Sequence, residues 1–242
     1  SEGMRMPSCP SGGASVQNLP STLYNAMLYP LAPYSLAGVV WYQGESNTGR
    51  AGEYAPLLRL LMNNWRTVFE QPGLPFAIVQ LANFMQPSSK PQNSQWAQLR
   101  EAQRTVAASD KNAELVVAID LGETVDIHPL RKKEVADRAA AAFSRMVFGK
   151  KVTLSPSVVS LVVRDGAMVL TLDQPLRPGK LHEFELAGAD GRYRNADAVA
   201  SGRTVTVECS QVKSPVSVRY AWKDNPIKAD CYGVNGWPAS PF

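Results

Sequence analysis

The sequence predicts an α/β protein, in which a parallel sheet with helices on its faces is followed by an antiparallel β-rich domain. Over the first 150 residues, short apolar runs alternate with longer amphipathic segments, which is the pattern of a parallel sheet. Beyond residue 150, short strands of two-residue period are separated by Gly, Asp and Pro, as in a small β-sandwich. We therefore divide the chain into a loop or junction (1–19), an α/β domain (20–150) and a β-rich domain (151–242).

Three apolar runs are the predicted strands of the parallel sheet. They are β-branched and nearly unbroken, which suits strands buried on both faces. These runs cover 38–43, 75–84 and 114–122. In the β-rich domain, Asp165 and Gly166 interrupt an alternating pattern over 157–176 and predict a hairpin.

Three amphipathic segments are the predicted helices. Each carries apolar residues at three- and four-residue steps. They cover 54–69, 94–109 and 129–149. The last has Pro129 in its first turn and ends on Gly149, as helix ends commonly do.

The composition is that of an ordinary globular protein. Hydrophobic residues make up 45% of the 242 positions and charged residues 19%, which argues against disorder and against a membrane-embedded chain. The net charge of +4 is small, and Lys and Arg are scattered rather than clustered, so we expect no nucleic-acid partner. No apolar run approaches the roughly 20 residues that a membrane-crossing helix needs, so we expect no membrane partner.

The first 21 residues are rich in Ser, Pro and Gly. They lack the basic and apolar regions of a signal peptide and are predicted to form a loop. Either the mature protein begins there or the chain continues a longer polypeptide. The cysteines, Cys9, Cys209 and Cys231, are odd in number and show no metal-ligand spacing, so at most one internal disulfide can form.

Two strand ends carry unusual polar residues. In open α/β sheets, ligands bind beyond the carboxyl ends of the strands. The first end is Gln43-Gly-Glu45-Ser46-Asn47, which directly follows the run Val-Val-Trp-Tyr. The second is the segment DLGETVDIHPL, which follows the third predicted strand and carries three acidic residues and a histidine. These two segments are the candidate functional site.

His128 is the candidate general base. It lies two residues after Asp126, and a carboxylate beside an imidazole can fix its tautomer and stabilise the imidazolium. The alternative is that Asp126 caps the following helix and His128 occupies a turn. The only other histidine, His182, lies in a strand with alternating polar residues and is predicted to be a surface residue.

Metal and phosphate sites are weaker candidates. One histidine and several carboxylates could hold a hard cation, but no second His or Cys stands at ligand spacing. QGESNTG lacks the Lys and the glycine spacing of a P-loop.

Several segments together resemble the sialate O-acetylesterase-like carbohydrate esterases of the SGNH hydrolase superfamily. The resemblance extends over nearly the whole chain from about residue 20. It rests on VVWYQGESN, WRTVFEQPGLPFAIVQLANF, WAQLREAQ, DIHPLRKKEVADRAA and VRYAWKDNP. The combination of WYQGESN and DIHP at this separation is the specific part.

The resemblance implies a three-layer α/β/α fold and an esterase that removes acetyl groups from sugars through a serine acyl-enzyme, without metal or cofactor. The sugar would be of the sialic acid or the xylan type. It assigns the oxyanion-stabilising amide to Asn47 and the catalytic pair to Asp126 and His128. Gln43 and Glu45 would position the site or the sugar. A periplasmic or secreted location is implied as well.

The nucleophile block of that family, a Gly-x-Ser motif after the first strand, is not found in this chain. Ser11, Ser15 and Ser21 lie in the predicted loop, and Ser46 is only a secondary candidate. We therefore interpret the chain as the C-terminal segment of a longer esterase, with an N-terminal segment of the same protein as the partner that carries the serine.

A second function class stays open. The chain could be a non-catalytic carbohydrate-binding fragment of such an esterase. Its stacking platform would consist of Trp222, Tyr232 and Trp237. A lipase-like esterase is a weaker alternative, because no long apolar lid is visible.

Overall fold

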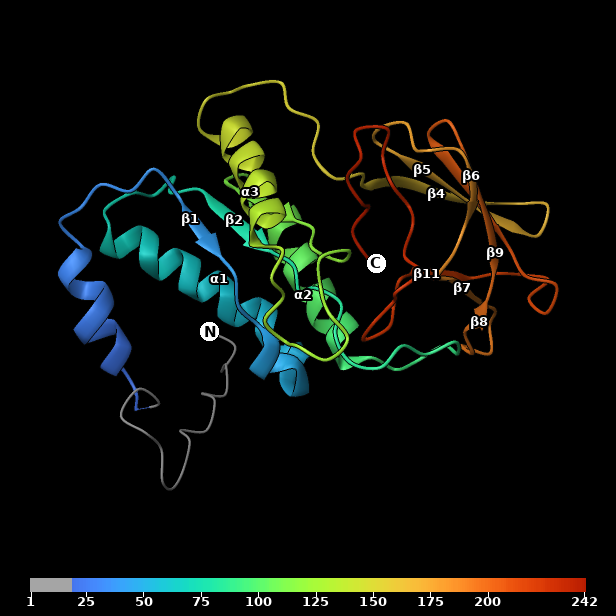
Figure 1. Ribbon diagram of the computed structural model, residues 1–242, viewed down its shortest axis with the longest axis horizontal. Coiled ribbons are helices and arrows are strands. Elements are labelled where there is room, and N and C mark those ends of the chain that lie inside the picture. Colours follow the sequence, from blue (N-terminus) through green and yellow to red (C-terminus); the bar gives the residue numbers. More distant parts are fainter. Residues whose placement is uncertain (1–18) are drawn as a thin grey trace.

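The computed structural model describes residues 19–242, which form an α/β unit and a β unit lying side by side (Figure 1). Most of the predicted junction, including Cys9, Ser11 and Ser15, lies outside the described residues. The α/β unit contains a parallel sheet in the order β1-β2-β3. Its strands and α-helices are β1 (Val39–Trp41), α1 (Ala51–Val68), β2 (Phe76–Val79), α2 (Gln95–Ser109), β3 (Ala113–Val116) and α3 (Lys132–Met146). Three short turns of helix, η2 (Tyr24–Leu28), η3 (Tyr29–Leu31) and η4 (Glu45–Arg50), complete the unit.

The parallel sheet is covered on both faces. Phe76 and Ile78 of β2 belong to a buried cluster with α1 and α2. Ala77 and Val79, which point to the opposite face, belong to a second cluster with α3. The layers are therefore helix, sheet and helix, and the predicted α/β fold is confirmed (Figure 1).

The strands are shorter than the apolar runs that predicted them. Leu81, Val117 and Ile119 follow β2 and β3 and are almost completely buried, but they lie outside the paired strands. Val117 and Ile119 pack instead against the core of the β unit. The apolar runs therefore predicted which residues are buried. The hydrogen-bonded strands stop before the buried residues do.

The third helix begins at Lys132, three residues later than predicted. Pro129 precedes it, and the Leu130 N–H donates to Glu123 Oε1 at 3.1 Å instead of entering the helix. The helix ends at Met146, three residues before the predicted end, and Gly149 lies beyond it with a φ of +61°.

The β unit consists of two antiparallel sheets, in the orders β4-β5-β10-β9-β6 and β11-β7-β8. The strands are β4 (Val158–Arg164), β5 (Ala167–Leu172), β6 (Gly179–Leu181), β7 (Phe184–Ala187), β8 (Arg194–Asn195), β9 (Asp197–Ser201), β10 (Thr204–Glu208) and β11 (Ser217–Tyr220). The hairpin predicted at Asp165-Gly166 is confirmed, since β4 pairs with β5 and the two residues have φ values of 50° and 79°. A two-residue turn of this kind requires a positive φ at both positions.

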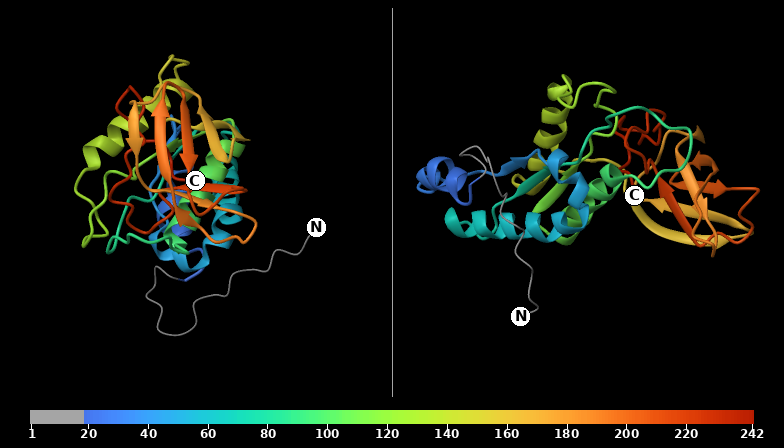
Figure 2. Two further views of the ribbon diagram at one scale, coloured as in Figure 1. Left: turned by 90° about the vertical axis from the view of Figure 1, so that its right-hand side faces the viewer. Right: turned by 90° about the horizontal axis from the view of Figure 1, so that it is seen from below.

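The two units share a core. Met168 and Leu170 of the larger sheet pack in one cluster with Phe184 and Tyr220 of the smaller sheet, and the cluster also contains Val117 from the α/β unit. The C-terminal segment runs between the units (Figure 2). No helix within 19–242 has the length and apolar character needed to span a membrane.

Candidate active site

The candidate site is built on three loops at one edge of the parallel sheet. Because the strands are parallel, the segments 42–50, 80–94 and 117–131 all leave from the same edge. Phe84 and Glu123 form an isolated parallel bridge that joins the second loop to the third. Both polar strand ends predicted from the sequence therefore lie at this edge.

The first loop holds Gln43 and Asn47 in direct contact. Gln43 Nε2 donates to Asn47 Oδ1 at 2.7 Å, and the Asn47 N–H donates to the Gly44 carbonyl at 2.9 Å. Gly44 has a φ of 148°, and a Cβ there would lie 2.7 Å from Leu99 Cδ2. Glycine is thus required for the chain to turn over α2 and place Asn47 in η4.

Tyr54 and Gln103 hold the loop from the helices below it. The Tyr54 hydroxyl donates to the Gln43 carbonyl (2.8 Å) and to Gln43 Oε1 (3.1 Å), and it accepts from Trp41 Nε1 at 3.2 Å. Gln103 Nε2 donates to the same carbonyl at 3.1 Å. Burial raises the pKa of Tyr54 above its ordinary value, so the hydroxyl keeps its proton at neutral pH.

Ser46 and Glu45 lie beside this network. Ser46 is exposed, and within 19–242 its hydroxyl has no hydrogen-bond partner. The Glu45 carbonyl accepts from Thr48 Oγ1 at 3.0 Å, which stabilises the first turn of η4. No base contacts Ser46 in the described part of the chain, so the structure offers no group to activate it.

Asp126 and His128 are adjacent in the third loop. Asp126 Oδ1 accepts from the His128 backbone N–H at 2.7 Å and lies 3.6 Å from His128 Nδ1. The second distance is too long for a hydrogen bond, so the carboxylate faces the imidazole without being bonded to it. Asp126 does not cap α3, because Arg131 is the N-cap and no side chain caps that helix, but His128 does lie in a turn, which the Asp126 contact to its N–H closes. The His128 side chain is 88% exposed and open to a group from outside the described residues.

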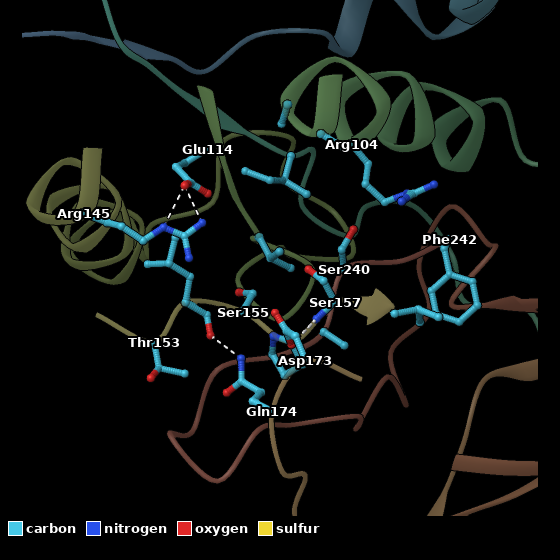
Figure 3. Close-up of a pocket in the computed structure, with 18 of the residues that line it drawn as sticks. Arg104, Glu114, Arg145, Thr153, Ser155, Ser157, Asp173, Gln174, Ser240 and Phe242 are labelled. Carbon is cyan, nitrogen blue, oxygen red and sulfur yellow. Dashed lines mark hydrogen bonds and ion pairs between the residues drawn. The ribbon is translucent and has the colours of Figure 1, made fainter. Parts of the chain in front are cut away.

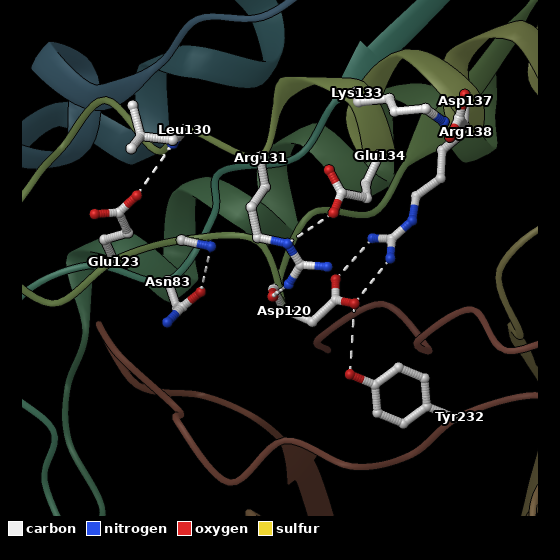
Figure 4. Close-up of polar contacts among 11 residues, drawn as sticks. Asn83, Asp120, Glu123, Leu130, Arg131, Lys133, Glu134, Asp137, Arg138 and Tyr232 are labelled. Carbon is white, nitrogen blue, oxygen red and sulfur yellow. Dashed lines mark hydrogen bonds and ion pairs between the residues drawn. The ribbon is translucent and has the colours of Figure 1, made fainter.

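The ends of the third loop are anchored (Figure 4). Asp120 forms a two-bond ion pair with Arg138, at 2.7 and 2.8 Å, and its carbonyl accepts from Arg131 Nη1 at 3.0 Å. On the side of the second loop, Asn83 Oδ1 accepts from the Gly122 N–H at 2.8 Å. These contacts fix the loop stem from which Asp126 and His128 project.

Gly122 is the tightest point of this stem. A Cβ at this position would lie 1.8 Å from the Asn83 carbonyl oxygen. We expect Gly122→Ala to lower the free energy of unfolding by about 1–3 kcal/mol, because two backbone segments must separate. Urea unfolding would measure this. The matched control is Gly52→Ala in α1, where a Cβ meets no atom within 4 Å and stability should rise by about 0.5–1 kcal/mol. Equal stability of Gly122→Ala and wild type would contradict the expectation.

A cavity of about 440 Å³ lies beside η4, where Thr48, the residue after Asn47, lines it. It is lined by Thr48 from η4, by the second loop and the start of α2, and by Asp224 from the C-terminal segment. Gln92, Asn93 and Gln95 also line it, together with Met85 and Trp96, and no Lys, Arg or His does. Amides and a carboxylate are groups that hydrogen-bond hydroxyls.

A larger cavity, of about 680 Å³, lies elsewhere (Figure 3). It is bounded by β3, α2, α3, the segment 152–158 and the C-terminus. None of Gln43, Asn47, Asp126 and His128 lines it. An Arg145–Glu114 ion pair lies on its wall, apolar and polar residues line it in about equal number, and no histidine is among them.

The other sequence candidates make ordinary contacts. His182 is half-exposed, and its Nδ1 lies 2.6 Å from Asp230 Oδ2. Within 19–242 no three His, Cys, Asp or Glu side chains are grouped as metal ligands. Cys209 and Cys231 are both free thiols, and burial raises the pKa of Cys231 to about 12.

The three aromatic residues of the binding-fragment alternative are engaged within the protein. The Tyr232 hydroxyl donates to Asp120 at 3.4 Å, and Arg177 lies over its ring. Trp237 packs against the cluster of α3, and Arg219 lies 5.8 Å from the Trp222 ring centroid. All three are partly buried, and these contacts weigh against a stacking platform.

Sequence reasoning did not identify Tyr54 and Gln103 as site residues. Gln103 lies on the buried side of α2 with Leu99 and Val106 and is itself fully buried. An uncharged polar residue on the apolar side of a predicted helix is the signal that could have identified it, because buried polar groups require partners.

Comparison with known proteins identifies the family of this chain. Residues 6–153 match the family model described as carbohydrate esterase, sialic acid-specific acetylesterase. Sialate O-acetylesterase of Mus musculus is 29% identical over 252 residues, which cover 92% of this chain and 47% of the mouse protein. The Homo sapiens protein of the same name is 28% identical, with 92% and 48% covered. The chain thus spans about half the length of these relatives.

A solved structure is also similar. The crystal structure of a carbohydrate acetylesterase from Xanthomonas citri superposes with a TM-score of 0.87 at 37% sequence identity. The match covers 93% of this chain and 54% of that chain.

Proposed function

Because this chain belongs to the family of sialic acid-specific carbohydrate acetylesterases, we propose that it is the C-terminal part of a carbohydrate O-acetylesterase that acts through a serine acyl-enzyme. One observation carries the proposal. The two loops with the Asn47 amide and with Asp126 and His128 leave the same edge of one parallel sheet. An oxyanion donor and a carboxylate-flanked imidazole are the groups that acyl transfer requires.

The reaction assigns one role to each group. His128 accepts the serine hydroxyl proton while the serine oxygen attacks the acetyl carbonyl carbon, and the Asn47 amide donates to the oxyanion. His128 returns the proton to the departing sugar oxygen, leaving an acetyl-enzyme. Water then repeats the sequence and releases acetate. Asp126 orients the imidazole and stabilises its charged form.

The serine, in this proposal, comes from an N-terminal segment of the same protein. An open sheet edge supports this idea. The Val39 N–H donates to the Pro75 carbonyl beside β2, so the backbone groups of Val40 point to the other side, where no strand within 19–242 pairs with β1. Val40 is 51% exposed, although parallel strands are normally covered on both faces. A further strand could pair with this edge.

Exposed apolar side chains also lie in the segment that precedes the open edge of β1. Among the residues preceding β1, Leu23, Met27, Tyr29 and Tyr34 are between 52% and 66% exposed. Apolar surface of this extent commonly marks an interface. A covering segment of the same protein would bury it.

The proposed substrate is an acetylated sugar of the sialic acid or the xylan type. The cavity lined by Thr48 and Asp224 supports a hydroxyl-rich ligand, since amide and carboxylate residues line it beside Met85 and Trp96. Fold similarity does not decide between these sugars. The periplasmic or secreted location expected from the resemblance stays a prediction.

A fluorophosphonate probe, which reacts with activated serines, tests the proposal. We expect intact-mass analysis of the native preparation to show one adduct per protein, on a serine outside the 242 residues of this chain. His128→Ala should abolish the labelling. An adduct on Ser46 would refute the separate origin of the serine. A folded native preparation that is not labelled at all would favour the binding-fragment alternative.

A further inference from the structure

The hydrogen-bond network beneath η4 has a defined direction. The Trp41 indole N–H can only donate, and its acceptor is the Tyr54 hydroxyl at 3.2 Å. Tyr54 has one hydroxyl proton to give onward, and two oxygens of Gln43 share it, the carbonyl at 2.8 Å and Oε1 at 3.1 Å. Because Tyr54 donates to Gln43 Oε1, the amide of Gln43 presents Nε2 to Asn47.

The donor from Gln43 also sets the orientation of the Asn47 side-chain amide. Its Oδ1 accepts from Gln43 Nε2 at 2.7 Å, so the opposite end of the amide, Nδ2, is the end free to donate. Without this contact an asparagine amide can turn over and present oxygen in place of N–H. An oxygen at that place would repel a developing oxyanion.

The base of the network cannot rotate. Gln103 is fully buried, and its Oε1 accepts from the Leu81 N–H at 2.9 Å. This orientation turns Gln103 Nε2 to the carbonyls of Gln43 (3.1 Å) and Val79 (3.2 Å). The Gln43 backbone is therefore held from α2 while its side chain is held from α1.

We infer that Tyr54, acting through Gln43, is a positioning residue that fixes the Asn47 amide with its N–H₂ end available to the oxyanion. The inference rests on the role of Asn47 in the proposed function. Tyr54 lies 4% exposed within α1 and makes its contacts from beneath the loop, so it acts on Asn47 only through Gln43.

Two variants of the complete esterase test this inference by steady-state kinetics. Gln43→Glu places a carboxylate against Asn47, which must then turn its N–H₂ inward, and we expect kcat to fall by about 10²-fold, as for loss of an oxyanion donor. Tyr54→Phe removes the proton that orients Gln43, and we expect kcat to fall about 5- to 10-fold, as for one hydrogen bond. KM should stay within about twofold in both, since the effect concerns the transition state.

Combination with Asn47→Ala separates positioning from a general structural role. Asn47→Ala alone should lower kcat by about 10²–10³-fold. In that background, neither Gln43→Glu nor Tyr54→Phe should lower kcat further, because groups that act through one residue are not additive. The matched control is Tyr193→Phe, which removes a tyrosine hydroxyl bonded to Ser217 Oγ (2.5 Å) in the β unit and should leave kcat unchanged.

The results distinguish two failures. The positioning role would be wrong if Gln43→Glu or Tyr54→Phe lowered kcat by the same factor with and without Asn47→Ala. It would also be wrong if both single variants kept the kcat of the wild type. Neither result would contradict the proposed function. Full activity of Asn47→Ala itself would overturn the assignment of the oxyanion donor, and the inference with it.

Discussion

Replacement of His128 by alanine is expected to lower kcat of the complete esterase by about 10²–10⁴-fold, the usual contribution of a general base. Within this chain the only other histidine, His182, lies in the β unit and is paired with Asp230 at 2.6 Å, so His128 is the histidine assigned to take the serine proton. The side chain of His128 is 88% exposed, so its removal should not affect stability. Acetate release from an acetylated sugar, followed at constant pH, would measure the effect.

His182→Ala is the matched control for this prediction. It removes the second imidazole, together with its ion pair to Asp230, and it should leave kcat within about twofold of the wild type because the pair is half-exposed. The proposed mechanism would be wrong if His128→Ala stayed active, or if His182→Ala rather than His128→Ala abolished turnover.

Replacement of Arg100 by methionine is expected to produce the largest loss of stability. The guanidinium is fully buried and donates to four carbonyls, those of Leu81 (2.8 Å), Ala82 (2.9 Å), Lys223 (2.7 Å) and Asp224 (2.8 Å). Each buried acceptor that loses its donor costs about 1–3 kcal/mol, so we expect a loss of at least about 4 kcal/mol in the free energy of unfolding.

The contacts of Arg100 also join distant segments. They tie the loop after β2 to the C-terminal segment, which supplies Asp224 to the cavity lined by Thr48. Burial lowers the pKa of Arg100 to about 9, partly offset by the charge of Asp224, so the group stays protonated at neutral pH. Arg100→Lys keeps the charge but cannot donate to all four carbonyls. Its free energy of unfolding should lie between those of the wild type and Arg100→Met.

Urea unfolding of the complete protein would measure both Arg100 variants. The matched control is Arg104→Met on the next turn of α2, since Arg104 is partly exposed and pairs with Glu101 at the surface. Arg104→Met should change the free energy of unfolding by no more than about 1 kcal/mol. A loss of less than about 1 kcal/mol in Arg100→Met would show that water replaces the guanidinium, contrary to the expectation.

Much of the architecture follows from local patterns along the chain. Alternation of buried strands and amphipathic helices predicted the α/β fold, and the Asp165-Gly166 turn predicted its hairpin because both residues tolerate positive φ. The polar strand ends at Gln43–Asn47 and Asp126–His128 were visible because apolar runs stop abruptly there. Parallel strand order then brings both ends to one edge without any further information.

The contacts that orient the site could not be predicted in this way. Tyr54 reaches Gln43 from a different element, Gln103 lies 60 residues from its acceptor, and Arg100 binds carbonyls more than 120 residues away. Periodicity records which side of an element is buried, whereas these bonds depend on which elements meet and at what angle. The direction of the Asn47 amide, the open edge of β1 and the anchoring of the His128 loop therefore follow from packing between distant segments, which no local pattern encodes.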